Sequence, residues 1–130
     1  MSFAWAGYLD FAESLCANTA DESALRTATS RAYYASYHAA VRYVRTYVGA
    51  VETDGPTSHD KVWGALKSAK QRSAQRAGVH GPTLKKSRKA ADYDNQPAHL
   101  LVHAQEAVRH AKLIIDHLAA GAKEYESGQR

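Results

Sequence analysis

Hydrophobic residues recur every three or four positions in the first part of the chain, which is the period of a helix that packs on one face. The first such stripe predicts a helix over about residues 3–17 and consists of Trp5, Tyr8, Ala12 and Leu15. Thr19 and Glu22 form a capping-box pattern, and the next break is Gly49. A single long helix is therefore predicted from about Ala20 to Val48.

The second part of the chain alternates turn signals with helical patterns. Ser58 can cap a helix that begins at His59 and fades in the stretch "RAGVHGP" at 76–82, and a basic loop is expected at 85–89. A short helix fits before Pro97, which starts a last long helix with apolar positions at Leu101, Ala104, Val108, Ala111, Ile115 and Leu118. The pattern predicts one all-α domain over 1–130, without strands and with a frayed tail at 126–130.

The long second helix has two contrasting faces when its residues are placed 100° apart. Its buried stripe is predicted to hold Tyr33, Tyr37, Ala40 and Val44. The opposite side is basic, with Tyr34 at its edge, and holds Thr27, Arg31, His38, Arg42 and Arg45. Arg31 and His38 lie nearly in line, about 10 Å apart along the helix axis. The two side chains can therefore bracket one phosphate.

Charge is unevenly distributed along the chain, whose net charge is +4. Residues 61–89 contain nine Lys or Arg and no Asp or Glu, and residues 26–45 contain four arginines and no acid. Such tracts indicate a polyanion or an acidic protein as partner, because cations on a phosphate backbone release condensed counterions; the alternative is a solvated surface. The cations expected to contact nucleic acid are Arg42, Arg45, Lys85, Lys86, Arg88 and Lys89.

Composition narrows the cellular setting. The single cysteine, Cys16, excludes an internal disulfide and a cysteine-rich zinc site, and it suits a reducing compartment. No basic segment followed by an apolar run opens the sequence, and "LIIDHLAA" at 113–120 is too short to cross a membrane. We therefore expect a cytoplasmic protein without a membrane partner.

The pair Arg31 and His38 suggests a reaction. Histidine titrates near neutrality and can move a proton, while arginine can hold a phosphate oxygen as negative charge builds up. This combination fits metal-independent cleavage of RNA, in which the 2′-hydroxyl attacks the neighbouring phosphate and cationic donors stabilise the phosphorane. DNA lacks that hydroxyl. The alternative is a solvent-exposed arginine stripe with an incidental histidine.

Three segments resemble, in order and rough spacing, the signature segments of small prokaryotic HEPN-domain proteins: "SRAYYASYHAA" at 30–40, "SHDKVWGAL" at 58–66 and "RKAADYD" at 88–94. The resemblance implies an up-and-down bundle of four to five helices that pairs into a homodimer. Many members of the family are toxins encoded beside a small nucleotidyltransferase antitoxin. In catalytic members, an arginine and a histidine separated by four to six residues cleave RNA at the dimer cleft.

By this resemblance Arg31 is the phosphate clamp and His38 the general acid or base of an endoribonuclease toxin. Ala32 stands where catalytic members commonly have a polar residue, and Ala40 where many toxins have a tyrosine that the partner modifies with nucleotide. Regulation by that modification is therefore not predicted. Other members bind nucleotides or accompany a nucleotidyltransferase without cleaving RNA, so a non-catalytic nucleotide- or RNA-binding module is the alternative function.

Three further residues are expected to support the site: Tyr34, His59 and Asp92. His59 lies in the first turn of its helix, where a structural hydrogen bond is its expected role, although it can also line the cleft. Arg88 stands four residues before Asp92, which is expected to fix the basic loop through an ion pair or a capping bond. Tyr34 and Val41 offer apolar area to a second copy of the chain.

Other patterns of catalytic or cofactor sites are absent from the sequence. The last helix carries His99, His103, His110 and His117, but only the first two are four residues apart, and no Cys or well-spaced Glu completes a metal site. The sequence contains no glycine-rich phosphate loop, no Ser-His-Asp pattern and no carboxylate pair. We expect neither a metal nor a cofactor, and Cys16 is expected to be a small buried residue.

Overall fold

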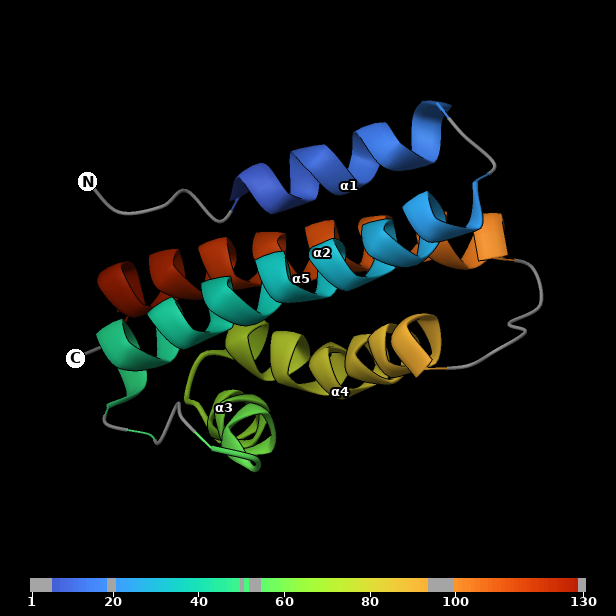
Figure 1. The fold of residues 1–130 in the computed structure, drawn as a ribbon. Helices are drawn as coiled ribbons and strands as arrows, with labels where there is room; N and C mark the ends of the chain where they lie inside the picture. Colours follow the sequence, from blue (N-terminus) through green and yellow to red (C-terminus); the bar gives the residue numbers. More distant parts are fainter. Residues whose placement is uncertain (1–5, 19–20, 50, 52–54, 94–99, 129–130) are drawn as a thin grey trace.

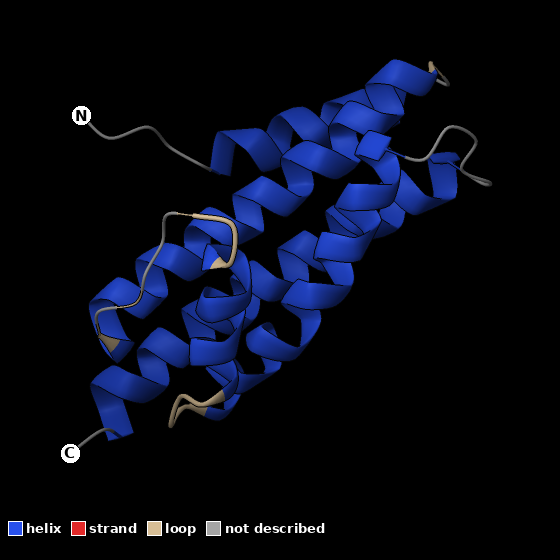
Figure 2. Cartoon of the chain, turned by 60° about the horizontal axis from the view of Figure 1, so that its bottom comes forward, coloured by secondary structure: helices blue, strands red, loops and turns tan. Residues whose placement is uncertain are grey.

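The computed structural model describes residues 6–18, 21–49, 51, 55–93 and 100–128. These ranges contain helices and turns but no strand (Figure 2). The helices are α1 Ala6–Asn18, α2 Glu22–Tyr43, α3 Ser58–Lys67, α4 Arg72–Tyr93 and α5 Leu100–Gly128, and the π-helical segment η1 Val44–Val48 continues α2. The predicted all-α bundle of four to five helices is confirmed.

In the described part of the chain, α1, α2, α4 and α5 lie roughly alongside one another with alternating directions along the sequence, and the ten-residue α3 crosses them (Figure 1). α2 and α5 lie side by side in the middle of the molecule, with α1 packed on one side of this pair and α4 on the other. α3 packs against α4 and is viewed nearly end-on in Figure 1. α1 and α3 therefore lie on opposite sides of the central pair.

The core lies between these layers and is rich in aromatic residues. The largest fully buried side chains are Trp63, Tyr33, Leu66, Leu84, Ile114, Val44 and Val62. The buried stripe predicted for α2 is confirmed, because Tyr33, Tyr37, Ala40 and Val44 are each at most 5% exposed. The helical period thus identified the inner face of α2.

The ends of α2 and η1 follow from capping residues. A carboxylate oxygen of Asp21 accepts a hydrogen bond from the Ala24 amide at 3.0 Å, so the helix begins at Glu22 rather than at the predicted Ala20. Thr19, the predicted cap, lies outside the described residues. The break at Gly49 is where the sequence predicts it: this residue has φ 135°, a backbone conformation that favours glycine.

α4 is the element that the sequence pattern predicted wrongly. The expected break at 76–82 and the basic loop at 85–89 are both part of one continuous helix, which contains Pro82 in its interior. The glycines of this stretch permit a close helix crossing instead of a turn, because a Cβ atom on Gly81 would lie 2.1 Å from the Trp63 ring. The chain turns earlier, at 68–71, between α3 and α4.

The boundaries of α3 and α5 also differ from prediction. Ser58 is the first residue of α3 and is buried, and Thr57 precedes the helix without a side-chain capping bond. Pro97 lies outside the described residues, and α5 begins at Leu100 and continues to Gly128, through part of the tail predicted to fray. None of the helices in the described ranges has the length and apolar character needed to cross a membrane.

Candidate functional site

The three segments that carry the HEPN resemblance meet where α3 crosses α2 and α4. Each of these helices contributes side chains to one group of contacting rings and charges. We call this group the aromatic network; its members are Tyr33, Tyr34, Tyr37, His59, Trp63 and Arg88.

Hydrogen bonds join three members of the network in a chain. The Trp63 Nε1–H donates to the Tyr33 hydroxyl at 3.1 Å, and the same hydroxyl lies 2.6 Å from His59 Nδ1. Because the indole nitrogen can only donate, all three groups are satisfied when the Tyr33 hydroxyl donates to Nδ1 and His59 carries its proton on Nε2. Burial raises the pKa of Tyr33, which keeps this hydroxyl protonated. The structural hydrogen bond expected for His59 is therefore present.

His59 is held neutral by its surroundings. Its ring stacks on Tyr37 with a centroid distance of 3.8 Å and an interplanar angle of 9°. Burial, followed by the positive charges of Lys85 and Arg88, lowers the pKa of His59 to about 4. A ring of this kind accepts and donates hydrogen bonds without carrying charge at neutral pH.

Arg88 is the member of the aromatic network that lies on α4. Its guanidinium lies 5.5 Å from the centroids of both Tyr33 and Tyr34 and forms an ion pair with Asp92 at 3.1 Å. The ion pair that the four-residue spacing predicted is thus present, although it fixes a helix rather than a loop. Arg88 is only 9% exposed, so it belongs to the packed network and not to the outer surface where a nucleic-acid contact was expected.

His38 borders the network. Its ring is half-buried, lies edge-on to Tyr37 at 5.5 Å between centroids, and is tilted against Tyr34 at 6.3 Å. Burial lowers the pKa of His38. The neutral ring is the form that can accept a proton.

Arg31 lies on the same side of α2 as His38, two turns earlier, and contacts a different helix. Its guanidinium packs 4.8 Å from the centroid of the Tyr8 ring of α1. The two predicted catalytic residues therefore share a helix face, as the spacing indicated, but Arg31 contacts α1 whereas His38 contacts the aromatic network.

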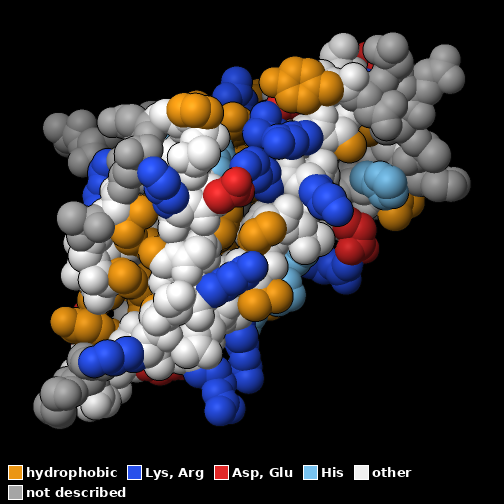
Figure 3. Space-filling view, turned by 90° about the horizontal axis from the view of Figure 1, so that it is seen from below, with side chains coloured by type: hydrophobic (Ala, Val, Ile, Leu, Met, Phe, Trp, Pro, Cys, Tyr) orange, Lys and Arg blue, Asp and Glu red, His pale blue; other side chains and the backbone are white. Residues whose placement is uncertain are grey.

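Of the five remaining predicted cations, four are exposed and Lys85 is partly buried. Lys86 and Lys89 are exposed on α4, and Arg42 and Arg45 are exposed near the end of α2 and in η1. Lys85 forms an ion pair with Asp60 of α3 at 3.2 Å. Figure 3, which looks onto α3 and α4, shows Lys and Arg side chains spread over this face with few acidic side chains among them. The tract 61–89 therefore presents a basic surface.

The predicted dimer margin is only partly accessible. Tyr34 is half-buried by its contacts with His59 and Arg88. Val41 is 8% exposed and belongs to the core of this chain, so it offers no area to a second copy. The predicted apolar contact between Val41 and a second copy of the chain was wrong. Val41 lies at the margin of the basic face of α2, and from there its side chain packs against neighbouring helices of its own chain.

A second histidine group, which sequence reasoning missed, joins α4 to α5. His110 Nε2 lies 2.9 Å from His80 Nδ1, and the His80 ring is stacked with that of His117, with 5.9 Å between centroids. We call His80, His110 and His117 the histidine cluster. Spacing within one helix could not reveal it, because His80 lies in the stretch predicted as a break. A helical reading of 72–93 would have placed His80 in a helix, but it would not have shown that His80 faces α5.

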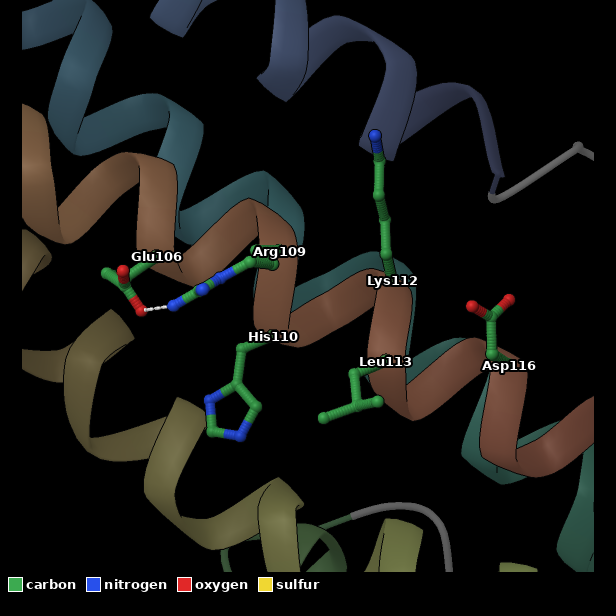
Figure 4. A pocket seen from close by; sticks show the side chains of 6 residues that line it. All are labelled: Glu106, Arg109, His110, Lys112, Leu113 and Asp116. Atoms are coloured by element: carbon green, nitrogen blue, oxygen red, sulfur yellow. Dashed lines mark hydrogen bonds and ion pairs between the residues drawn. The ribbon is translucent and has the colours of Figure 1, made fainter.

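A shallow pocket of about 520 Å³ lies on α5 beside the histidine cluster. Figure 4 shows its lining on a single helix, with the Glu106–Arg109 ion pair at one end and the His110 ring pointing toward α4. The complete lining is Glu106, Arg109, His110, Lys112, Leu113 and Asp116. None of the residues predicted for catalysis or nucleic-acid binding lies in it.

The histidine pair weighed as a metal site and Cys16 have the following surroundings. No group of three His, Cys, Asp or Glu side chains within the described ranges is arranged to hold a metal ion. Of the predicted pair on α5, His99 lies outside the described residues and His103 is exposed. Cys16 is half-buried, and burial, followed by the charge of Glu13, raises the pKa of its thiol.

No family model, no curated protein and no solved structure matches the chain.

Proposed function

We propose that this chain is a HEPN-like, RNA-directed protein whose α3–α4 face binds the phosphate backbone. One observation carries the proposal: the tract 61–89, with nine cations and no acid, covers most of α3 and α4, which pack against each other, and seven of its nine cations are exposed. Cations on one face favour a polyanion, because each phosphate they neutralise releases condensed counterions. The meeting of the three HEPN-like segments in the aromatic network supports the family assignment. The proposal places the protein with its RNA in the cytoplasm.

Binding measured against salt concentration tests this function. The double change Lys86→Glu and Lys89→Glu should lower the slope of log affinity against log salt by about one for each phosphate that the protein no longer neutralises. The matched control is Lys112→Glu with Lys123→Glu, which makes the same charge change on exposed positions of α5. If the α4 variant has the same slope as the unchanged protein, the basic face is only solvated and the proposal fails.

RNA cleavage is a second candidate function, favoured by the position of His38. This half-buried histidine, with its lowered pKa, lies on the same side of α2 as Arg31. We propose that His38 takes the proton of a 2′-hydroxyl as that oxygen bonds to phosphorus, while Arg31 binds a phosphate oxygen. The bond to the 5′-oxygen breaks, and His38 of the second copy in a homodimer protonates it. The products are a 2′,3′-cyclic phosphate and a 5′-hydroxyl.

Substitution of each residue distinguishes cleavage from binding alone. His38→Ala should abolish cleavage, leave RNA binding nearly unchanged and behave the same way with a chelator, because the reaction uses no metal. Arg31→Ala should weaken both cleavage and binding. A homodimer is required for the composite site, so a protein that sediments only as a monomer at tens of micromolar would contradict cleavage.

The non-catalytic module is favoured by the contact of Arg31 with Tyr8, which holds the proposed phosphate clamp against α1. In that case the parent protein cleaves neither structured nor single-stranded RNA, and His38→Ala has little effect on binding. If the protein is a toxin, we also propose that a nucleotidyltransferase antitoxin is its partner. This partner is supported if a gene for such an enzyme lies beside the gene of this chain and the two products copurify.

A further inference from the structure

Tyr93, the last residue of α4, exposes most of its ring. Its side chain is 76% exposed, the highest value among the large hydrophobic residues of the described ranges. No hydrogen bond or ring contact joins it to another residue in the part of the chain that the structure describes. Its planar face is thus available to an external ring.

Two exposed lysines lie on the same side of α4 as Tyr93. Lys89 and Lys86 precede it by four and seven residues, which places all three within about 60° around the helix. The lysines lie about 6 and 10 Å from Tyr93 along the axis. We call these three residues the Tyr93 stripe.

The charges around the stripe favour an anion. Farther toward the start of α4, Arg72 and Arg76 are also exposed. The one carboxylate among the described residues of α4, that of Asp92, is in an ion pair with Arg88, so its charge is largely compensated. A phosphate beside Tyr93 therefore meets cations without an uncompensated acid among the described residues of α4.

We propose that Tyr93 stacks on an unpaired base while Lys86 and Lys89 contact the adjoining phosphates, so that the α4 face selects single-stranded RNA. This inference rests on the proposed RNA binding and adds the class of RNA. An aromatic ring beside a basic groove is the usual means of holding single strands, because every unpaired base presents a flat face. In a duplex those faces are covered by neighbouring base pairs, and Tyr93 gains nothing.

Phe11 provides a matched control on the other side of the molecule. It is 50% exposed on α1, across the α2–α5 pair from α3 and α4 (Figure 1). Its neighbours Asp10 and Glu13 are acidic and exposed. Phe11→Ala therefore removes an exposed aromatic ring without touching a basic surface.

The experiment compares a single-stranded oligouridylate with an RNA duplex of equal length, with binding measured by fluorescence anisotropy across salt concentrations. Tyr93→Ala should weaken single-strand binding about 5- to 150-fold, the usual range for loss of one stacked base, and leave duplex binding and the salt slope unchanged. Tyr93→Phe should retain the affinity, because the hydroxyl takes no part. Phe11→Ala should change neither RNA affinity.

The outcomes distinguish a failure of the stacking inference from a failure of the proposed RNA binding. Unchanged single-strand binding in Tyr93→Ala, or an equal loss for duplex and single strand, overturns the stacking role while RNA binding itself stands. If the unchanged protein binds neither RNA, the proposed function fails first, and an acidic protein becomes the better partner for the basic face. Circular dichroism on each variant shows that α4 remains folded.

Discussion

α4 contacts its neighbours through two groups of side chains that both contain histidine but are built differently. Toward α2 and α3, His59 stacks on Tyr37, bonds to Tyr33 and is accompanied by the buried cation of Arg88. Toward α5, His80 shares a hydrogen bond with His110, and its ring contacts within the described ranges are with the rings of His110 and His117. Aromatic packing dominates the first group, whereas a hydrogen bond between two imidazoles joins members of the second.

The two groups lower the pKa values of their histidines, and so keep the rings neutral, in different ways. In the aromatic network, burial and two cations lower the pKa of His59 to about 4. In the histidine cluster, burial followed by the neighbouring His80 lowers the pKa of both His110 and His117. Both groups should therefore make stability depend on pH, and the aromatic network should also carry more of the packing energy.

The largest expected effect is the loss of Trp63. Trp63→Ala should lower the free energy of unfolding by about 3–5 kcal/mol, because it empties a fully buried site and removes the donor to Tyr33. Urea unfolding followed by circular dichroism measures it. Trp63→Phe keeps most of the volume and should cost about 1–2 kcal/mol. A loss below about 1 kcal/mol in Trp63→Ala would show that aromatic packing does not dominate this contact.

The close crossing of α3 and α4 should be the next most sensitive feature. A Cβ atom on Gly81 would lie 2.1 Å from the Trp63 ring, so Gly81→Ala should cost about 1–3 kcal/mol or more through overpacking. Gly64→Ala is the matched control, because no atom lies within 4 Å of a Cβ atom at that position. In α3 it should be neutral or stabilise by up to about 1 kcal/mol. Equal effects at both glycines would contradict the crossing.

The fold was predictable wherever the signal is local. The buried stripe of α2 follows from periodicity, and Gly49 marks the end of η1 by its own backbone preference. α4 was not predictable in this way, because Gly81 followed by Pro82 is a turn signal in the sequence. The glycine lies inside a helix because the Trp63 ring packs against it. Trp63, the residue that packs against Gly81, lies on a different helix, α3.

The same distinction holds for the site. The Arg88–Asp92 pair follows from a spacing of four on one helix, and the role of His59 follows from its place in a first turn. By contrast, the contact of Arg31 with Tyr8 and the bond between His80 and His110 join helices far apart in sequence. No helical-wheel argument reaches such pairs, because it places residues around one axis only.

The pH dependence of stability compares the two histidine groups directly. The unfolded chain protonates His59 near pH 6.5, whereas the folded pKa is about 4, so the unfolded state binds more protons between these values. Stability should therefore be full above pH 6.5 and fall as the pH drops toward 4. The full shift corresponds to about 3 kcal/mol, and solvent screening of this half-buried ring reduces the expected loss to about 1–2 kcal/mol.

Two variants assign that loss to its source. His59→Gln cannot take up the proton but keeps an acceptor for the Tyr33 hydroxyl, so its stability should depend less on pH over this range. His110→Gln should remove a smaller part of the dependence at its upper end, because its pKa is also lowered by burial. Urea unfolding at successive pH values measures both. A flatter profile in His110→Gln than in His59→Gln would reverse the ranking of the two groups.

The smallest expected effects compare two ion pairs of α4. Asp92→Asn leaves the Arg88 cation buried without its counter-charge, and it should cost about 1 kcal/mol, less than a fully buried pair because Asp92 is 29% exposed. Asp60→Asn breaks the pair with Lys85, but the Asp60 side chain is 73% exposed and the cost should stay below about 0.5 kcal/mol. The Asp60 effect should vanish in about 1 M salt, since exposed charges are screened, and most of the Asp92 effect should persist. Equal costs with equal salt dependence would place Arg88 in contact with solvent and remove it from the aromatic network.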